Sequence, residues 1–72
     1  MFIFSARLKA LRKSVMTQPD MASILGLSVR NYQRVEYGEI EISLENLVKV
    51  ADVLHVSTDY LLGRTNFPDN QL

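Results

Sequence analysis

The sequence has no cysteine, no tryptophan and a single histidine, and only three glycines and two prolines among its 72 residues. Without cysteine, the chain forms neither a disulfide framework nor a thiolate metal site. One histidine, His55, is too few for an imidazole site, so we expect no metal. His55 instead falls at the end of a predicted helix, where a cationic side chain is favourable.

Motifs of enzymes and membrane proteins are also absent from the sequence. It has no phosphate-binding loop, no arrangement of serine, histidine and aspartate for nucleophilic catalysis, and no pair of acids placed for general acid–base chemistry. We therefore expect no enzyme activity, no catalytic residue, no cofactor and no small-molecule ligand. No apolar run approaches the roughly 20 residues that span a membrane, and the apolar start lacks the basic leading segment of a signal peptide. We expect a cytoplasmic protein with no membrane partner.

Length and composition predict one small domain, residues 1–72, with a net charge of zero. A chain of this size buries only about 60% of its unfolded surface, so the fold depends on apolar packing and gains from self-association. Residues 1–34 carry six basic side chains and one acid, a net charge of +5, whereas residues 35–72 carry two basic side chains and seven acids, a net charge of −5. A positive half can meet phosphates while the acidic half faces away, although small proteins also show such asymmetry by chance.

Apolar spacing, capping residues and glycine stops predict five short helices and no strand. Their expected extents are Ser5–Ser14, Thr17–Leu25, Ser28–Tyr37, Ser43–Leu54 and Ser57–Leu62. The apolar side chains expected to face the core are Phe4, Leu8, Leu11, Val15, Met21, Ala22, Leu25, Tyr32, Val35, Leu44, Leu47, Val48, Ala51 and Leu54. The stretch of about 64–72 contains a proline and has little periodicity, so we expect a loose C-terminal tail.

Residues 17–37 predict two short helices joined by a tight turn. Ala22 supplies a small residue where the helices approach, Gly26 supplies a left-handed corner, and Leu27 supplies an apolar plug in the turn. Apolar residues of the second helix anchor it to the body of the protein. Its polar side chains are therefore expected to face outward.

These outward side chains are of the types that read bases in the major groove. Arginine forks onto guanine, asparagine and glutamine pair with adenine, and valine contacts the methyl group of thymine. Hydroxyl and amide groups at helix N-termini suit a phosphate. The candidate DNA-binding residues from this reasoning are Gln18, Ser28, Val29, Arg30, Asn31, Gln33, Arg34 and Tyr37, with Lys9 and Lys13 near phosphates. On helix pattern alone, Arg30 and Arg34 also fit an ordinary solvent-exposed face, and the two lysines fit a surface role almost as well.

Four motifs fall in register along the chain: RLKALR at residues 7–12, TQPDMASILGLS at 17–28, EYG at 36–38 and SLENLVKVADVLHVSTDYLLG at 43–63. Together they resemble the helix-turn-helix family of phage Cro and repressor proteins, also called the xenobiotic-response-element type. The resemblance implies an all-α, compact, five-helix lambda-repressor-like bundle. It also implies that the protein binds operator DNA, usually as a dimer, and regulates transcription.

The resemblance further implies roles for individual positions. These are phosphate contact and bracing of the recognition helix for Gln18, base contact for Val29, Arg30 and Arg34, and contact with the DNA backbone near Thr17 and Tyr37. Arg12 and Glu36 occupy positions that often form an internal ion pair, with two separate surface charges as the alternative.

Four features depart from the family pattern. The turn at residues 13–16 is one residue short and lacks the common glycine, and Ile24 takes an outward position that is normally polar. The loop at residues 39–41 reads Glu-Ile-Glu where lysine or arginine is usual, and Ile42 replaces the usual proline. We expect these changes to weaken phosphate contact on one side more than they alter the fold.

Two functions of different classes follow from these observations. The first is a sequence-specific transcriptional regulator, a repressor that binds a palindromic operator in double-stranded DNA through the major groove, as a homodimer. The alternative is a protein-interaction module on the same fold, such as an antitoxin or anti-repressor, with little direct DNA binding. The acidic C-terminal half and an apolar patch of Phe2, Ile3 and Ile24 favour this alternative slightly.

Overall fold

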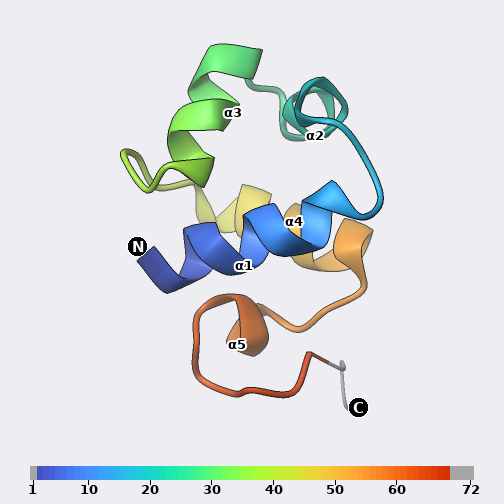
Figure 1. The fold of residues 1–72 in the computed structure, drawn as a ribbon, viewed down its shortest axis with the longest axis vertical. Helices are drawn as coiled ribbons and strands as arrows, with labels where there is room; N and C mark the ends of the chain where they lie inside the picture. The colour runs from blue at the N-terminus through green and yellow to red at the C-terminus, as the bar shows by residue number, and fades with distance from the viewer. Residues whose placement is uncertain (1, 69–72) are drawn as a thin grey trace.

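A computed structural model describes residues 2–68, and these residues form five α-helices and no strand. The helices are α1 (Phe2–Lys13), α2 (Gln18–Leu25), α3 (Val29–Glu36), α4 (Leu44–Leu54) and α5 (Thr58–Leu61). α1 and α4 cross the middle of the molecule, α2 and α3 lie on one side of them, and α5 lies on the other (Figure 1). The predicted all-α bundle of five helices is confirmed.

Side-chain caps set where four of the helices begin. Thr17 and Asp20 form a capping box, in which Thr17 Oγ1 accepts from the Asp20 amide at 3.2 Å and Asp20 Oδ2 accepts from the Thr17 amide at 3.3 Å. The side chains of Ser28, Ser43 and Ser57 each accept from the backbone amide three residues further on. Each cap contributes about 1 kcal/mol. The predicted helix starts at these four hydroxyl residues are therefore confirmed.

Every helix contributes at least one fully buried side chain to a single core. From α1 to α5, side chains with no exposed surface include Leu8, Met21, Tyr32, Val50 and Leu61. Full burial of an apolar side chain of this size contributes about 1.5–3 kcal/mol. Because these residues come from five different helices, their contact is what holds the helices together.

α1 differs from its predicted extent at both ends. It begins at Phe2 rather than at Ser5, and the buried hydroxyl of Ser5 donates to the Val35 carbonyl of α3 at 2.8 Å. The helix ends before Val15, which leaves the helical phase and is 63% exposed. The predicted burial of Val15 is therefore wrong, and Met16 packs against the core in its place.

The buried stripe of α4 is narrower than its apolar pattern indicates. Leu44 is 82% exposed and Val48 is 52% exposed, so their predicted burial is wrong. Val50 and Ala51 are buried instead, and Leu47 packs against the core. One helix thus presents two apolar side chains to solvent, four residues apart and on the same side.

Residues 64–68 are tied to the bundle. The guanidinium of Arg7 in α1 donates to the Thr65 carbonyl at 2.7 Å and to Asn66 Oδ1 at 3.0 Å. A side chain from a distant helix thus contacts Thr65 and Asn66, while the looseness of the tail stays a prediction. The remainder of the predicted tail, residues 69–72, lies outside the described residues.

Within residues 2–68, no helix has the length and hydropathy needed to cross a bilayer. In the same range, no three histidine or acidic side chains gather into a group that could hold a metal ion. His55 ends α4 in a left-handed conformation with φ of +57°, so its predicted place at a helix C-terminus is confirmed.

Candidate nucleic-acid interface

α2 and α3 form a helix-turn-helix whose corner is fixed by backbone contacts. Gly26 has φ of +69°, a left-handed conformation that glycine adopts without a side-chain clash. The Leu27 amide donates back to the Ala22 carbonyl at 2.9 Å, and Leu27 packs against the core. Asn46 of α4, for which the local pattern gives no signal, donates through Nδ2 to the Leu25 carbonyl at 3.1 Å. The orientation of α3 relative to α2 is therefore held both within the turn and from α4.

α3 turns one side to the core and the other to solvent. Tyr32 and Val35 are buried, as predicted. The candidate DNA-binding side chains around the other side are exposed, apart from the half-buried Gln33: Ser28, Val29, Arg30, Asn31, Arg34 and Tyr37. This exposure is the geometry that contact with a duplex requires, and the contact itself stays a prediction.

The remaining candidates flank α3. Thr17 is exposed at the N-cap of α2. Its hydroxyl oxygen accepts from the Asp20 amide, and its hydroxyl hydrogen can donate to a further acceptor. Gln18 is half-buried at the first position of α2. Lys9 and Lys13 are exposed on α1. Their contact with phosphate stays a prediction, because exposure alone fits a surface role equally well.

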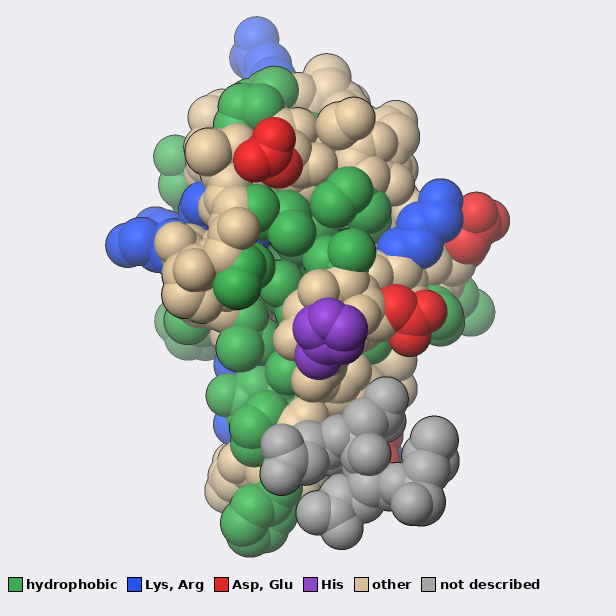
Figure 2. Space-filling model, turned by 90° about the vertical axis from the view of Figure 1, so that its right-hand side faces the viewer, with side chains coloured by type: hydrophobic (Ala, Val, Ile, Leu, Met, Phe, Trp, Pro, Cys, Tyr) green, Lys and Arg blue, Asp and Glu red, His purple; other side chains and the backbone are tan. Residues whose placement is uncertain are grey.

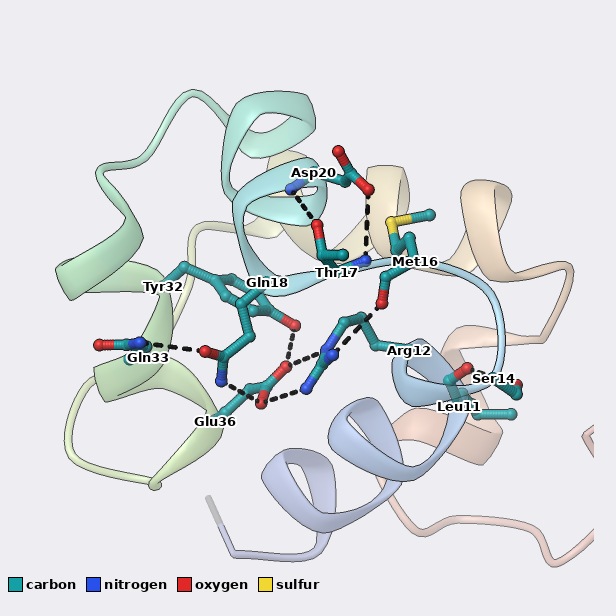
Figure 3. Close-up of polar contacts among 10 residues, drawn as sticks. All are labelled: Leu11, Arg12, Ser14, Met16, Thr17, Gln18, Asp20, Tyr32, Gln33 and Glu36. Atoms are coloured by element: carbon teal, nitrogen blue, oxygen red, sulfur yellow. Dashed lines mark hydrogen bonds and ion pairs between the residues drawn. The ribbon is translucent and has the colours of Figure 1, made fainter.

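The buried carboxylate of Glu36 in α3 links that helix to α1 and α2 (Figure 3). Glu36 Oε2 accepts from Arg12 Nε at 2.8 Å and from the Tyr32 hydroxyl. Glu36 Oε1 accepts from Arg12 Nη2 at 3.1 Å and from Gln18 Nε2 at 3.1 Å. The ion pair between Arg12 and Glu36 that the family resemblance implied is present, and the side chain of Glu36 has no exposed surface. The part played by the Tyr32 hydroxyl was missed, since the periodicity marks this residue only as apolar core.

The surroundings of these groups shift their pKa values. Burial raises the pKa of Glu36, but the hydrogen bonds that it accepts, first of all from Arg12, outweigh burial and leave the pKa below its ordinary value of 4.5. The hydrogen bond to Glu36 raises the pKa of Arg12 in spite of burial. Burial, and then the hydrogen bond to Glu36, raises the pKa of Tyr32. At neutral pH the network therefore holds an ionised carboxylate, a charged guanidinium and a neutral phenol.

Gln18 links the buried pair to the outward side of α3. Its Nε2 donates to Glu36, while its Oε1 accepts from Gln33 Nε2 at 3.0 Å. Gln18 therefore braces α3, as the family resemblance implied, and it orients the side-chain amide of Gln33. Contact of Gln18 with a phosphate stays a prediction.

The apolar patch expected from Phe2, Ile3 and Ile24 does not form as one surface. Ile24 lies on α2, on the opposite side of the fold from the N-terminal end of α1 that carries the other two residues (Figure 1). The face next to α2 has its own band of hydrophobic side chains through the middle, with most charged side chains toward its edges (Figure 2). Ile3 is also partly covered, because it packs against Gly63. This support for the interaction-module alternative is therefore lost.

The lowered pKa of Glu36 makes stability depend on pH in a defined direction. Above the ordinary glutamate pKa of 4.5, the ionised Glu36 contributes its full stabilisation to the folded protein. This contribution is lost as the pH falls below that value and through the lower pKa of Glu36 in the folded state. We expect the free energy of unfolding in urea to decrease below about pH 4.5 and the Glu36→Gln variant to show a smaller decrease. Glu45→Gln, at an exposed position of α4, is the matched control and should behave as the unchanged protein. If the free energy of unfolding fell equally with pH in Glu36→Gln and in the unchanged protein, Glu36 would not be the group responsible.

Comparison with known proteins gives curated relatives over most of the chain. The phage CTXphi transcriptional repressor RstR of Vibrio cholerae is 44% identical over 66 residues, which are 90% of this chain and 59% of that protein. YonR, an SPbeta prophage-derived uncharacterized HTH-type transcriptional regulator of Bacillus subtilis, is 40% identical over 65 residues, which are 89% of this chain and 60% of that protein. The chain thus spans about three-fifths of the length of these relatives.

A solved structure and a family model agree with these relatives. The restriction-modification controller protein C.AhdI from Aeromonas hydrophila has a similar structure, with a TM-score of 0.71 and 31% identity over 83% of this chain and 92% of that one. The family model described as helix-turn-helix matches residues 8–61, which include all of α2, α3 and α4. The resemblance drawn from the sequence motifs is confirmed: this chain belongs to the helix-turn-helix family.

Proposed function

We propose that residues 1–72 form a single DNA-binding domain of a transcriptional regulator, a repressor that acts in the cytoplasm by occupying an operator. The observation that carries this proposal is the two-sided arrangement of α3. Tyr32 and Val35 anchor its inner side in the core. Arg30 and Arg34 are exposed on its outer side, where a duplex can receive them. The names of the curated relatives, a repressor and a regulator of transcription, support the same function.

Recognition in this proposal divides between base contacts and phosphate contacts. α3 enters the major groove, where Arg30 and Arg34 bind guanine edges and Asn31 and Gln33 suit adenine. Lys9 and Lys13, the exposed lysines of α1, release counterions from the phosphates, so affinity falls as salt rises. Backbone contacts come from the helix N-termini and the end of α3, at Thr17, Gln18, Ser28 and Tyr37. The mechanism has no catalytic step.

One recognition helix reads only a few base pairs, so the proposal includes a homodimer on a palindromic operator. An apolar surface on α4 supports this part of the proposal. Leu44 is 82% exposed and stands beside an apolar groove of about 180 Å³, larger than the roughly 150 Å³ cavity that accepts benzene. The groove is lined by Phe4, Glu41, Ile42, Ser43, Leu44, Leu47 and Leu62. A closed two-fold dimer uses the same self-complementary patch on both copies, and an exposed Leu44 next to an apolar groove offers such a patch.

The experiment that tests the function is selection from a random pool of duplex DNA, followed by sequencing. We expect an enriched palindrome with half-sites about one helical turn, roughly 34 Å, apart. Gel retardation by this sequence should weaken as salt is raised. The interaction module, by contrast, should select no sequence and show no salt-sensitive retardation, and that result would overturn the proposal.

The Arg34→Ala variant should lose about 1–3 kcal/mol of operator binding, because Arg34 is one of two exposed guanidinium groups on the outer side of α3. The loss should be accompanied by relaxed selection at one base pair of each half-site. Arg64→Ala is the matched control, since it removes an exposed arginine that pairs with Asp59, away from α3. Titration of labelled operator duplexes measures both variants. Unchanged affinity for Arg34→Ala, or an equal loss in the control, would show that the assigned face is wrong.

A further inference from the structure

The chain turns back sharply at the end of α3 and brings Glu39 beside Arg34. Gly38 has φ of +78°, and its amide donates to the Val35 carbonyl at 3.0 Å. The Glu39 amide then donates to the Arg34 carbonyl at 2.9 Å. This pair of hydrogen bonds is the Schellman arrangement at a helix C-terminus. The backbone of Glu39 is therefore fixed relative to the residue that it contacts.

The side chains of the two residues also meet. Glu39 Oε1 lies 3.4 Å from Arg34 Nε, and both side chains are about half exposed. The contact uses the Nε edge of the guanidinium, so the two Nη groups can still donate to another acceptor. These two groups are the fork that binds O6 and N7 of guanine. A carboxylate at the Nε edge is thus compatible with a base contact, and it restricts where the fork points.

The same residues line one hollow on the outer side of α3. Its lining consists of Arg30, Gln33, Arg34, Tyr37 and Glu39. Glu39 is therefore on the surface that faces DNA in the proposed function, where its charge repels phosphates. An exposed ion pair contributes little to the stability of a fold. A role in stability therefore does not account for a carboxylate at this place.

We infer that Glu39 is a positioning residue for base recognition, which holds the guanidinium of Arg34 toward guanine and keeps it from contacting phosphates at non-operator sequences. This inference rests on the proposed function and deepens it. Glu39 lowers affinity for DNA in general and raises the ratio between operator and random DNA. The acidic loop, which as a departure from the family pattern was expected only to weaken phosphate contact, then contributes to specificity.

The test compares Glu39→Ala with Glu45→Ala, which removes the same charge from an exposed position of α4. Dissociation constants are measured over a salt series for the selected operator, for the operator altered at the base pair assigned to Arg34, and for a random duplex. We expect Glu39→Ala to bind the random duplex more tightly and to lose about two- to fivefold of the discrimination at that base pair, the range that an exposed ion pair supports. The control should leave this discrimination unchanged.

Two further variants separate positioning from a general effect of charge. Glu39→Gln keeps an oxygen acceptor for Nε, so it should retain part of the discrimination while gaining affinity for the random duplex. In the Arg34→Ala background, Glu39→Ala should cause no further loss of discrimination. Unchanged discrimination in Glu39→Ala would overturn the inference while leaving the function intact, whereas no salt-sensitive binding by the unchanged protein would overturn both.

Discussion

Replacing Arg12 by alanine is expected to destabilise the fold by about 3–5 kcal/mol, because it leaves a buried carboxylate without its cation. The side chain of Glu36 has no exposed surface, so its charge depends on the groups packed around it. A domain of this size has a total stability of only about 4–11 kcal/mol. The Arg12→Ala variant should therefore be largely unfolded, or close to it, at temperatures where the unchanged protein is folded. Thermal unfolding followed by circular dichroism measures the difference.

The control for this prediction removes the second charge as well. In the variant with both Arg12→Met and Glu36→Gln, the interior holds no unpaired ion, and the glutamine keeps an oxygen for the hydroxyl of Tyr32. We expect this double variant to be more stable than Arg12→Ala, since buried ion pairs are commonly replaceable by neutral groups at small cost. Arg64→Ala should melt as the unchanged protein does, because its partner is exposed. A melting temperature for Arg12→Ala equal to that of Arg64→Ala would contradict the argument.

The features of the fold that depend on local chemistry could be predicted from the sequence. Thr17 and Ser28 cap helices because their hydroxyl groups reach amides only three residues away, and Gly26 forms the corner because its own backbone allows a positive φ. Such features need no knowledge of distant residues. They fixed the order of the helices and the outward side of α3.

The predictions that were wrong concern burial and helix ends, which depend on packing between helices. Val48 and Val50 are both apolar residues of α4, and only contact with the other helices decides that Val50 is buried and Val48 exposed. The first helix was expected to start at Ser5, but that residue lies inside α1 and its hydroxyl donates to the Val35 carbonyl of α3.

In the candidate site, too, local features could be predicted and tertiary contacts could not. The helical period predicts which side chains of α3 face outward, but it does not predict the hydrogen-bond partners of long polar side chains. Glu39 reaches Arg34 because Gly38 turns the chain back, and Asn46 reaches the Leu25 carbonyl because α4 passes the end of α2. Both contacts need the tertiary arrangement.

Replacing Leu44 by aspartate should convert a dimer into a monomer and lower operator affinity by about 10²- to 10⁴-fold, the range that linked binding of two modules provides. The reason is geometric. A projecting leucine that enters the groove of a second copy buries apolar surface twice in a two-fold dimer, whereas aspartate would place a charge in each groove. Because Leu44 is 82% exposed in the single chain, the substitution should leave the melting temperature of the monomer unchanged.

The matched control for Leu44→Asp is Val15→Asp, which places the same charge at another exposed apolar residue, 63% exposed and away from the groove. Sedimentation equilibrium measures the mass of each variant, and titration of the selected palindrome and of a single half-site measures affinity. The Leu44→Asp variant should bind the palindrome no more tightly than the half-site, while Val15→Asp should keep the preference for the palindrome. A dimer that survives Leu44→Asp would place the interface elsewhere, and an unchanged protein that is monomeric on and off DNA would remove the dimer from the mechanism. In that case α3 would have to supply all of the base recognition from a single half-site.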